Sequence, residues 1–186
     1  MTELVNALLN VTRYELGTFL IEPEKVNLKS FLQNTKKDFE KQTSSKKISL
    51  SLSVSADLSE ITTDKTILDL IFDNLISNAI KYSPTGSKIK IRAKKSTARN
   101  FTVEIEDYGF GIPENQQNEI FKKMFRADNV VSKDTVGTGL GLYMVKSLVE
   151  TVGGGVSFIS EVDKGTTFTI VLPITMLRKT GSTRFK

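Results

Sequence analysis

The sequence contains neither cysteine nor histidine, and these two absences exclude whole classes of chemistry. Without cysteine there are no disulfide bonds and no thiolate zinc sites. Without either residue, Cys–His catalysis, Ser–His–Asp triads and most transition-metal sites are excluded as well. Oxygen ligands remain available, and these suit magnesium.

Long apolar runs are also absent, since no stretch of about 18 apolar residues that could span a membrane occurs. The first residues lack the basic-then-apolar pattern of a secretory signal, so a cytoplasmic location is expected. The 186 residues, 39% hydrophobic and 25% charged, fit one globular domain with an appended element. The net charge of +5 is most simply a mildly basic surface. A nucleotide is the expected polyanionic partner, because scattered lysines without an aromatic–basic platform argue against nucleic acid.

The spacing of apolar residues predicts a mixture of helices and strands. Helices are expected over 1–16, from Asn27 through Phe39, from Asp64 to about Tyr82, in a short helix from Pro113, and over 140–152. Strands are expected over Ile48–Val54, Lys88–Arg92 and Phe101–Ile105, and as a hairpin of Val156–Ser160 with Thr166–Leu172. A polar break is expected over Thr43–Lys47, a mobile loop over Asp128–Val136, and a polar, basic and frayed tail after Pro173. Because strands often follow strands directly, the fold class is α+β, with a mixed, mostly antiparallel sheet and helices on one face.

The helix from Asp64 changes character along one face. The face begins apolar and ends with Asn74, Asn78 and Lys81, which are spaced i, i+4 and i+7. A solvated helix end, with Lys81 complementing the helix dipole, would explain this pattern simply. The functional alternative is a pocket wall, because an amide oxygen can ligate magnesium and an ammonium can neutralise phosphate.

A carboxylate followed by two glycines comes directly after the strand Phe101–Ile105. In the sequence Asp107-Tyr108-Gly109-Phe110-Gly111, the glycines permit a tight turn or the close approach of another group. An Asp-containing turn is a common structural feature with no ligand at all. The functional alternative is that Asp107 accepts a hydrogen bond from a purine amino group.

Glycines open the helix over 140–152, in the segment Gly137-Thr138-Gly139-Leu140-Gly141-Leu142. Glycines let backbone N–H groups approach phosphate oxygens, and a helix N-terminus favours anions. The segment is neither a Walker A loop nor a dinucleotide-binding fingerprint, because it lacks Gly-Lys-Ser/Thr and has no strand before it. Together the three segments predict a pocket for a nucleoside triphosphate and its metal.

These segments resemble the N, G1, F and G2 boxes of the GHKL ATPase superfamily, in particular the catalytic ATP-binding domain of bacterial sensor histidine kinases. The resemblance runs from about Val26 to Pro173 and implies a Bergerat-type two-layer α/β sandwich. Residues 1–25 resemble the end of a dimerisation helix with its linker. The implied domains are therefore 1–25, the ATP-binding domain over 26–175, and a flexible basic tail over 176–186.

The resemblance also implies roles for individual residues. Asn78 would ligate magnesium, and Asn78, Lys81 and Arg126 would be the catalytic residues. Asp107 would bind the adenine amino group, Thr166 would complete the adenine site, and 127–136 would be an ATP lid. The implied nucleotide contacts are Asn74, Asn78, Lys81, Tyr82, Asp107, Gly109, Gly111, Ile112, Phe121, Arg126, Gly137, Thr138, Gly139, Leu140, Gly141, Leu142 and Thr166. Core packing is the alternative for Phe121 and Phe125, a solvated charge for Arg126, and simple strand formation for Thr166.

The implied activity is donation of the γ-phosphoryl group of ATP, with Mg²⁺, to a histidine outside this chain. The chain has no histidine, so it cannot autophosphorylate on one, and it is expected to be a piece of a longer kinase. The implied partners are ATP and ADP, a histidine-bearing dimerisation domain and a response regulator, with no nucleic acid and no membrane contact. A weak homodimer through residues 1–16 and a membrane anchor elsewhere in the parent protein stay open.

Two other functions remain as alternatives at this point. One is a free-standing GHKL regulator, such as a serine kinase of the anti-sigma type. The other is a non-enzymatic interaction module with a degenerate pocket.

Overall fold

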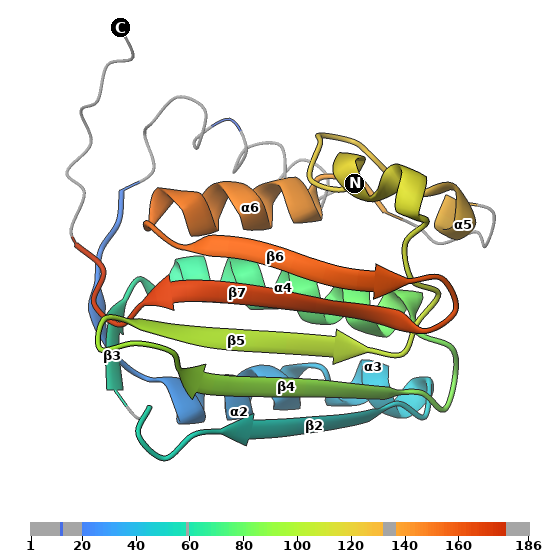
Figure 1. Ribbon diagram of the computed structural model, residues 1–186. Helices are drawn as coiled ribbons and strands as arrows, with labels where there is room; N and C mark the ends of the chain where they lie inside the picture. The colour runs from blue at the N-terminus through green and yellow to red at the C-terminus, as the bar shows by residue number, and fades with distance from the viewer. Residues whose placement is uncertain (1–11, 13–19, 59, 132–136, 178–186) are drawn as a thin grey trace, which may run out of the picture.

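Five strands form one sheet, which is the first layer of the computed structural model (Figure 1). The structure describes residues 12, 20–58, 60–131 and 137–177. The strand order is β2-β4-β5-β7-β6, where β2 and β4 are parallel and the other neighbours are antiparallel. The strands are β2 (Ser49–Val54), β4 (Lys88–Lys95), β5 (Asn100–Asp107), β6 (Gly155–Glu161) and β7 (Gly165–Pro173).

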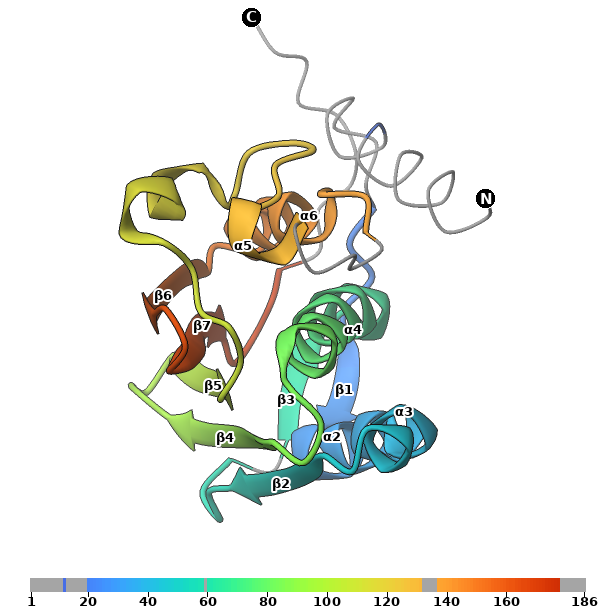
Figure 2. The same ribbon diagram turned by 90° about the vertical axis from the view of Figure 1, so that its right-hand side faces the viewer.

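Helices form the second layer and cover one face of this sheet, as the profile in Figure 2 shows. The helices are α2 (Leu28–Asp38), α3 (Glu40–Ser45), α4 (Lys65–Tyr82), α5 (Asp128–Val131) and α6 (Gly141–Thr151), with a 3₁₀ helix η1 (Glu114–Glu119). A separate two-stranded sheet pairs β1 (Glu24–Asn27) with β3 (Glu60–Thr63). The two-layer sandwich expected from the sequence is confirmed. Among the described residues, no helix is both long and apolar enough to cross a bilayer.

Apolar and charged side chains alternate along β4, and this alternation explains why one face of the sheet is covered by helices and the other is open. Ile89, Ile91 and Ala93 are buried under the helices. The intervening Arg92 lies on the other face, where its Nε and Nη1 atoms are 3.1 Å and 2.6 Å from carboxylate oxygens of Glu104 and Glu106 on β5. An antiparallel sheet with one buried face produces this pattern.

The helix α4 occupies the middle of the helical layer and packs against both α2 and α6. The face of α4 that meets the core is apolar, and its most deeply buried side chains are Ile67, Leu68, Ile71, Phe72, Leu75 and Ile76. Asp64 caps this helix by accepting a hydrogen bond from Ile67 N (3.2 Å), as the sequence predicts. The helix that carries the polar residues of interest is therefore held by the core along most of its length.

Several expectations need correction. The polar break expected over Thr43–Lys47 is wrong at its start, because Thr43–Ser45 completes the helix α3. Residues 128–131 form α5 instead of a loop, and 132–136 lie outside the described residues. The helix expected from Pro113 is a 3₁₀ helix, and the pair β1–β3 was not expected because four-residue strands carry little periodicity.

The chain after Pro173 is also more ordered than expected. Thr62 N donates to Ile174 O and Met176 N donates to Thr62 O, both at 2.8 Å, and the Met176 side chain is buried. The expectation of a frayed tail is therefore wrong as far as Met176. Residues 178–186 lie outside the described residues, as does the helix expected over 1–16 apart from Thr12, which is helical.

The N-cap side chains of α2 and α4, which are Asn27 and Asp64, allow a matched test of helix capping. Asp64 is buried and accepts from Glu22 N (2.9 Å) as well as Ile67 N, whereas Asn27 accepts only from Ser30 N (2.9 Å) at an exposed position. We expect Asn27→Ala to lower the free energy of unfolding by about 1 kcal/mol and Asp64→Ala by about 2 kcal/mol or more, because the second variant also leaves a backbone donor without its partner. Urea unfolding measures both losses, and equal losses would contradict the assigned role of Asp64.

Candidate functional site

The second half of α4 meets the first turn of α6 in direct contact. The Nδ2 group of Asn74 donates to Leu70 O (2.6 Å), which leaves its Oδ1 atom directed at Gly141. A Cβ atom on Gly141 would come within 2.6 Å of that oxygen. Glycine at this position lets the Asn74 amide approach the start of α6 this closely, and the two helices bring the first and third predicted motifs together.

Lys81 and Tyr82 lie at the end of α4, beside the start of the glycine-rich segment. A Cβ atom on Gly137 would overlap the Nζ atom of Lys81 and lie 3.9 Å from the Tyr82 hydroxyl oxygen. The same Nζ atom lies 4.9 Å from the centroid of the Tyr82 ring. These contacts place the Lys81 ammonium next to backbone that the sequence predicts to face phosphate.

A second cation lies close to Lys81. Burial and the positive charge of Arg126 lower the pKa of Lys81, and burial raises the pKa of Tyr82. Lys81 has no ion pair with any carboxylate of the described residues. Two crowded positive charges at a partly buried position favour the binding of an anion.

Asp107 is a buried carboxylate at the end of β5, opposite Thr166 of β7 in the sheet register. Its Oδ1 atom accepts hydrogen bonds from Gly109 N (2.9 Å) and Thr166 N (3.3 Å). Burial raises the pKa of Asp107 to about 6, although these two N–H groups act in the opposite direction. Among the described residues none donates to Oδ2, so this oxygen is available to a donor from a ligand.

The turn after Asp107 lies directly on the end of α4. A Cβ atom on Gly109 would come within 2.5 Å of Tyr82 O and 2.7 Å of the Asp107 Oδ1 atom, so only glycine fits there. Phe110 N donates to Tyr82 O at 3.1 Å. This contact joins the second predicted motif to the first, so all three motifs surround one region.

Ser160 of β6 belongs to this region and was missed by sequence reasoning. Its hydroxyl lies 2.8 Å from the Thr166 hydroxyl and accepts a hydrogen bond from Ile112 N (2.9 Å). Asn129 of α5 lies in the segment 127–136 that the resemblance assigns to an ATP lid, but it was not named individually; its Nδ2 group donates to Gly111 O at 2.9 Å. Ser160 comes from a strand whose local pattern contains no signal for a ligand site, so only the folded chain reveals it.

The remainder of the glycine-rich segment packs against the protein. Gly139 adopts a positive φ of 70° against the backbone of Met124. Thr138 accepts a hydrogen bond from Leu140 N (3.2 Å), Leu140 is buried, and Leu142 packs against the core.

Phe121, which was predicted as a nucleotide contact, and Phe125, which was matched to the F box, are packed against the core. The Phe121 ring meets the Phe158 ring edge-on at 5.9 Å, and the Lys146 ammonium lies 5.6 Å from the Phe121 centroid. Phe125 is partly buried against the same core. These contacts favour core packing for both residues, the alternative given above.

Asn78 lies one turn beyond Asn74 and is half-buried. Its side chain has no hydrogen bond to any described residue. Asn74 and Asn78 provide amide oxygens on one side of α4, and no cluster of three or more acidic, histidine or cysteine ligands occurs in the described part of the chain. An amide oxygen without such a cluster fits a metal that arrives with phosphate oxygens and keeps water ligands, as Mg²⁺ does.

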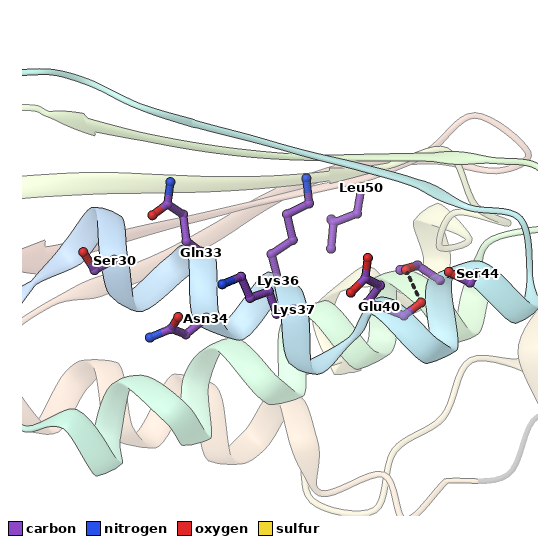
Figure 3. A pocket seen from close by; sticks show the side chains of 9 residues that line it. Ser30, Gln33, Asn34, Lys36, Lys37, Glu40, Ser44 and Leu50 are labelled. Carbon is purple, nitrogen blue, oxygen red and sulfur yellow. Dashed lines mark hydrogen bonds between the residues drawn. The ribbon is translucent and has the colours of Figure 1, made fainter.

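A separate polar groove of about 590 Å³ lies between α2, α3 and the edge strand β2 (Figure 3). The groove contains none of the predicted site residues. Lys36 and Lys37 lie on its α2 side, and Glu40 and Ser44 lie on its α3 side. The groove and the region around Asp107 are therefore different features of the molecule.

Comparison with known proteins decides the family. Residues 63–176, more than half of the chain, match the family described as histidine kinase-, DNA gyrase B- and HSP90-like ATPase. The chain belongs to this ATPase family. The matched region contains all three motifs that surround Asp107, and its family uses ATP.

The chain is similar to sensor kinases in particular. It is 30% identical over 171 residues to the alginate biosynthesis sensor protein KinB of Pseudomonas aeruginosa, covering 92% of this chain and 28% of KinB. It is 32% identical over 169 residues to the signal transduction histidine-protein kinase BarA of Escherichia coli, covering 89% of this chain and 18% of BarA. The chain thus spans less than a third of either relative.

Solved structures agree with the fold. The mycobacterial sensor histidine kinase MprB superposes with a TM-score of 0.70 at 25% identity, covering 84% of this chain and 100% of that chain. Full-length ShkA gives a TM-score of 0.83 at 23% identity, covering 95% of this chain and 36% of that chain. The expected Bergerat-type sandwich of this ATPase domain is confirmed.

The raised pKa of Asp107 predicts a pH dependence of stability. Because the native value of about 6 exceeds the ordinary 3.8, the native domain binds this proton more tightly than the unfolded chain does. The contribution of Asp107 is therefore largest below about pH 4 and is lost as the pH rises toward 6. We expect the difference in unfolding free energy between the wild type and Asp107→Asn to change over this range and to be flat above it. Urea unfolding at a series of pH values measures this difference, and a pH-independent difference would refute the burial argument.

Proposed function

We propose that this chain is the ATP-binding kinase domain of a sensor histidine kinase and that it donates the γ-phosphoryl group of ATP to a histidine outside the chain. The observation that carries this proposal is the convergence of three motifs on one region, with the Asp107 carboxylate on one side and the cations Lys81 and Arg126 on the other. The similarity to KinB and BarA supports the kinase class, and no observation favours the serine-kinase or non-enzymatic alternatives.

The adenine end of the ligand would lie at Asp107. Its Oδ2 atom would accept a hydrogen bond from the exocyclic amino group, while Oδ1 stays bonded to the backbone. Thr166 and Ser160 would place hydroxyls beside the base, because their oxygens are 2.8 Å apart and next to the same turn. This geometry supports purine recognition by a fixed acceptor in a low-dielectric position.

The phosphate end would lie between the end of α4 and the start of α6. Lys81 and Arg126 supply positive charge there, and the first turn of α6 supplies backbone N–H groups. Asn78 would contribute an amide oxygen to Mg²⁺, with Asn74 fixing the distance between the two helices. Mg²⁺, when bound, neutralises charge on the phosphate oxygens.

The chemical step depends mainly on the positioning of the reacting groups and on the neutralisation of phosphate charge, and it does not require a general base from this chain. Phosphoryl transfer passes through a loose transition state in which charge spreads over the phosphoryl oxygens. Lys81 and Arg126 would stabilise this charge, and the acceptor imidazole would come from a dimerisation domain. The proposed partners are therefore that domain, in the same protein or another subunit, and a response regulator that accepts the phosphoryl group next.

Nucleotide binding tests the adenine assignment. We expect Asp107→Asn to weaken binding of Mg-ATP by about tenfold or more, because a buried acceptor is replaced by a group that also presents N–H donors. Asp57→Asn, at an exposed position in the turn after β2, is the matched control and should leave the affinity unchanged. Isothermal titration measures both, and equal affinities of the two variants would remove Asp107 from the site.

Transfer of labelled phosphate tests the reaction class. Incubated alone with γ-labelled ATP, the chain should gain no acid-labile label, because it has no histidine. When a histidine-bearing dimerisation domain of a sensor histidine kinase is added, label should appear on that domain as acid-labile phosphohistidine. Acid-stable label on serine would instead support the anti-sigma type of kinase.

A further inference from the structure

The end of α4 is buried, and this creates a requirement for hydrogen-bond donors. The last carbonyl groups of a helix have no partner inside the helix and need water or another donor. Ser83, the residue after α4, is only 1% exposed, and Ile80 is 4% exposed. Water therefore has little access to these carbonyls, so the protein itself has to supply the donors.

One lysine supplies most of them. The Nζ atom of Lys46, at the C-terminal cap of α3, donates to Ile80 O (2.9 Å), Lys81 O (2.9 Å) and Ser83 O (3.2 Å). An ammonium has three N–H donors, and each has a carbonyl acceptor here. The positive charge also complements the negative end of the α4 dipole.

The fourth carbonyl at this end belongs to Tyr82 and accepts from Phe110 N at 3.1 Å, in the turn that follows Asp107. Lys46 is tied to this segment a second time, because Gly86 N donates to Lys46 O at 2.9 Å. Lys46 thus binds the carbonyls of both chain neighbours of Tyr82, namely Lys81 and Ser83, and the Lys81 side chain extends from the same turn.

We infer that Lys46 is a positioning residue of the nucleotide site, which acts through Lys81 by holding the last turn of α4 in place. This inference rests on the proposed function. Lys46 binds the carbonyl of Lys81 itself, whereas the Lys81 ammonium lies on the other side of the turn, beside Gly137. Loss of the Lys46 ammonium would release three carbonyls at once and let Lys81 leave the phosphate end of the site.

A double-mutant cycle measures this coupling. We expect Lys46→Met to weaken Mg-ATP binding by about tenfold, or about 1.4 kcal/mol, and Lys81→Met to weaken it at least as much. The double variant should bind no more weakly than Lys81→Met alone, because Lys46 has no effect once its target ammonium is gone. Lys41→Met removes the same charge from an exposed position on α3 and is the matched control.

Adenosine separates positioning from general damage, because it lacks phosphate. The affinity of the Lys46→Met variant for adenosine should differ from that of the wild type by less than about threefold, because β5 and β7 hold Asp107 in place. A chemical-shift titration measures this affinity. If Lys46→Met does not fold, Lys46→Gln keeps amide donors at this position and should show a smaller loss of the same kind.

Two results would overturn the inference: Lys46→Met binding Mg-ATP as well as Lys41→Met does, or losses from Lys46→Met and Lys81→Met that multiply in the double variant. Failure of the proposed function is a different result, in which the wild-type chain binds neither Mg-ATP nor adenosine.

Discussion

The candidate nucleotide site depends on the contact between the last turn of α4 and the turn that follows β5. The Tyr82 carbonyl accepts a hydrogen bond from Phe110 N, and a Cβ atom on Gly109 would come within 2.5 Å of the same carbonyl oxygen. Any side chain at Gly109 would force the helix and the turn apart. Because the two backbones touch, the Asp107 carboxylate and the Lys81 ammonium belong to one region even though they come from different layers of the sandwich.

This region keeps opposite charges apart at its two ends. Asp107 is buried beside backbone N–H groups, and burial raises its pKa to about 6. Lys81 is partly buried near Arg126, and burial together with that charge lowers its pKa. Both arrangements cost the folded domain free energy when no ligand is present. A ligand with an amino group at one end and an anion at the other would recover part of that cost, which is the chemistry of an adenine nucleotide.

Elements with strong periodicity were predicted well, and the reason is visible in particular residues. The apolar positions of α4 and β4 repeat at helical and strand spacing because Ile67, Ile71 and Ile91 all face one core. The strands β1 and β3 are too short to show such a repeat. Met176 was expected in a frayed tail, but it is buried because the chain after β7 pairs with Thr62.

The residues of the candidate site also fall into two groups: some have a recognisable local sequence pattern and others have none. Asp107 and the glycines could be proposed from the sequence because carboxylates and glycines at a strand end or a helix start are unusual enough to be noticed. Lys46 and Ser160 could not be proposed from the sequence, because a lysine in a polar turn and a serine in a strand are common and do not indicate a ligand site. The hydrogen bonds of Lys46 to Ile80, Lys81 and Ser83 exist only because α3 and the end of α4 meet at the same end of the sandwich (Figure 1).

The sequence by itself determined the fold class, the family resemblance and the exclusion of histidine and cysteine chemistry, because residue types and their spacing are local properties. Only the tertiary structure decided which oxygen of Asp107 is available, that Gly109 is required by its close contact with the Tyr82 carbonyl, and that Phe121 packs with Phe158. These facts depend on distances between residues far apart in the chain. Local patterns contain no information on such distances until the two layers have packed together.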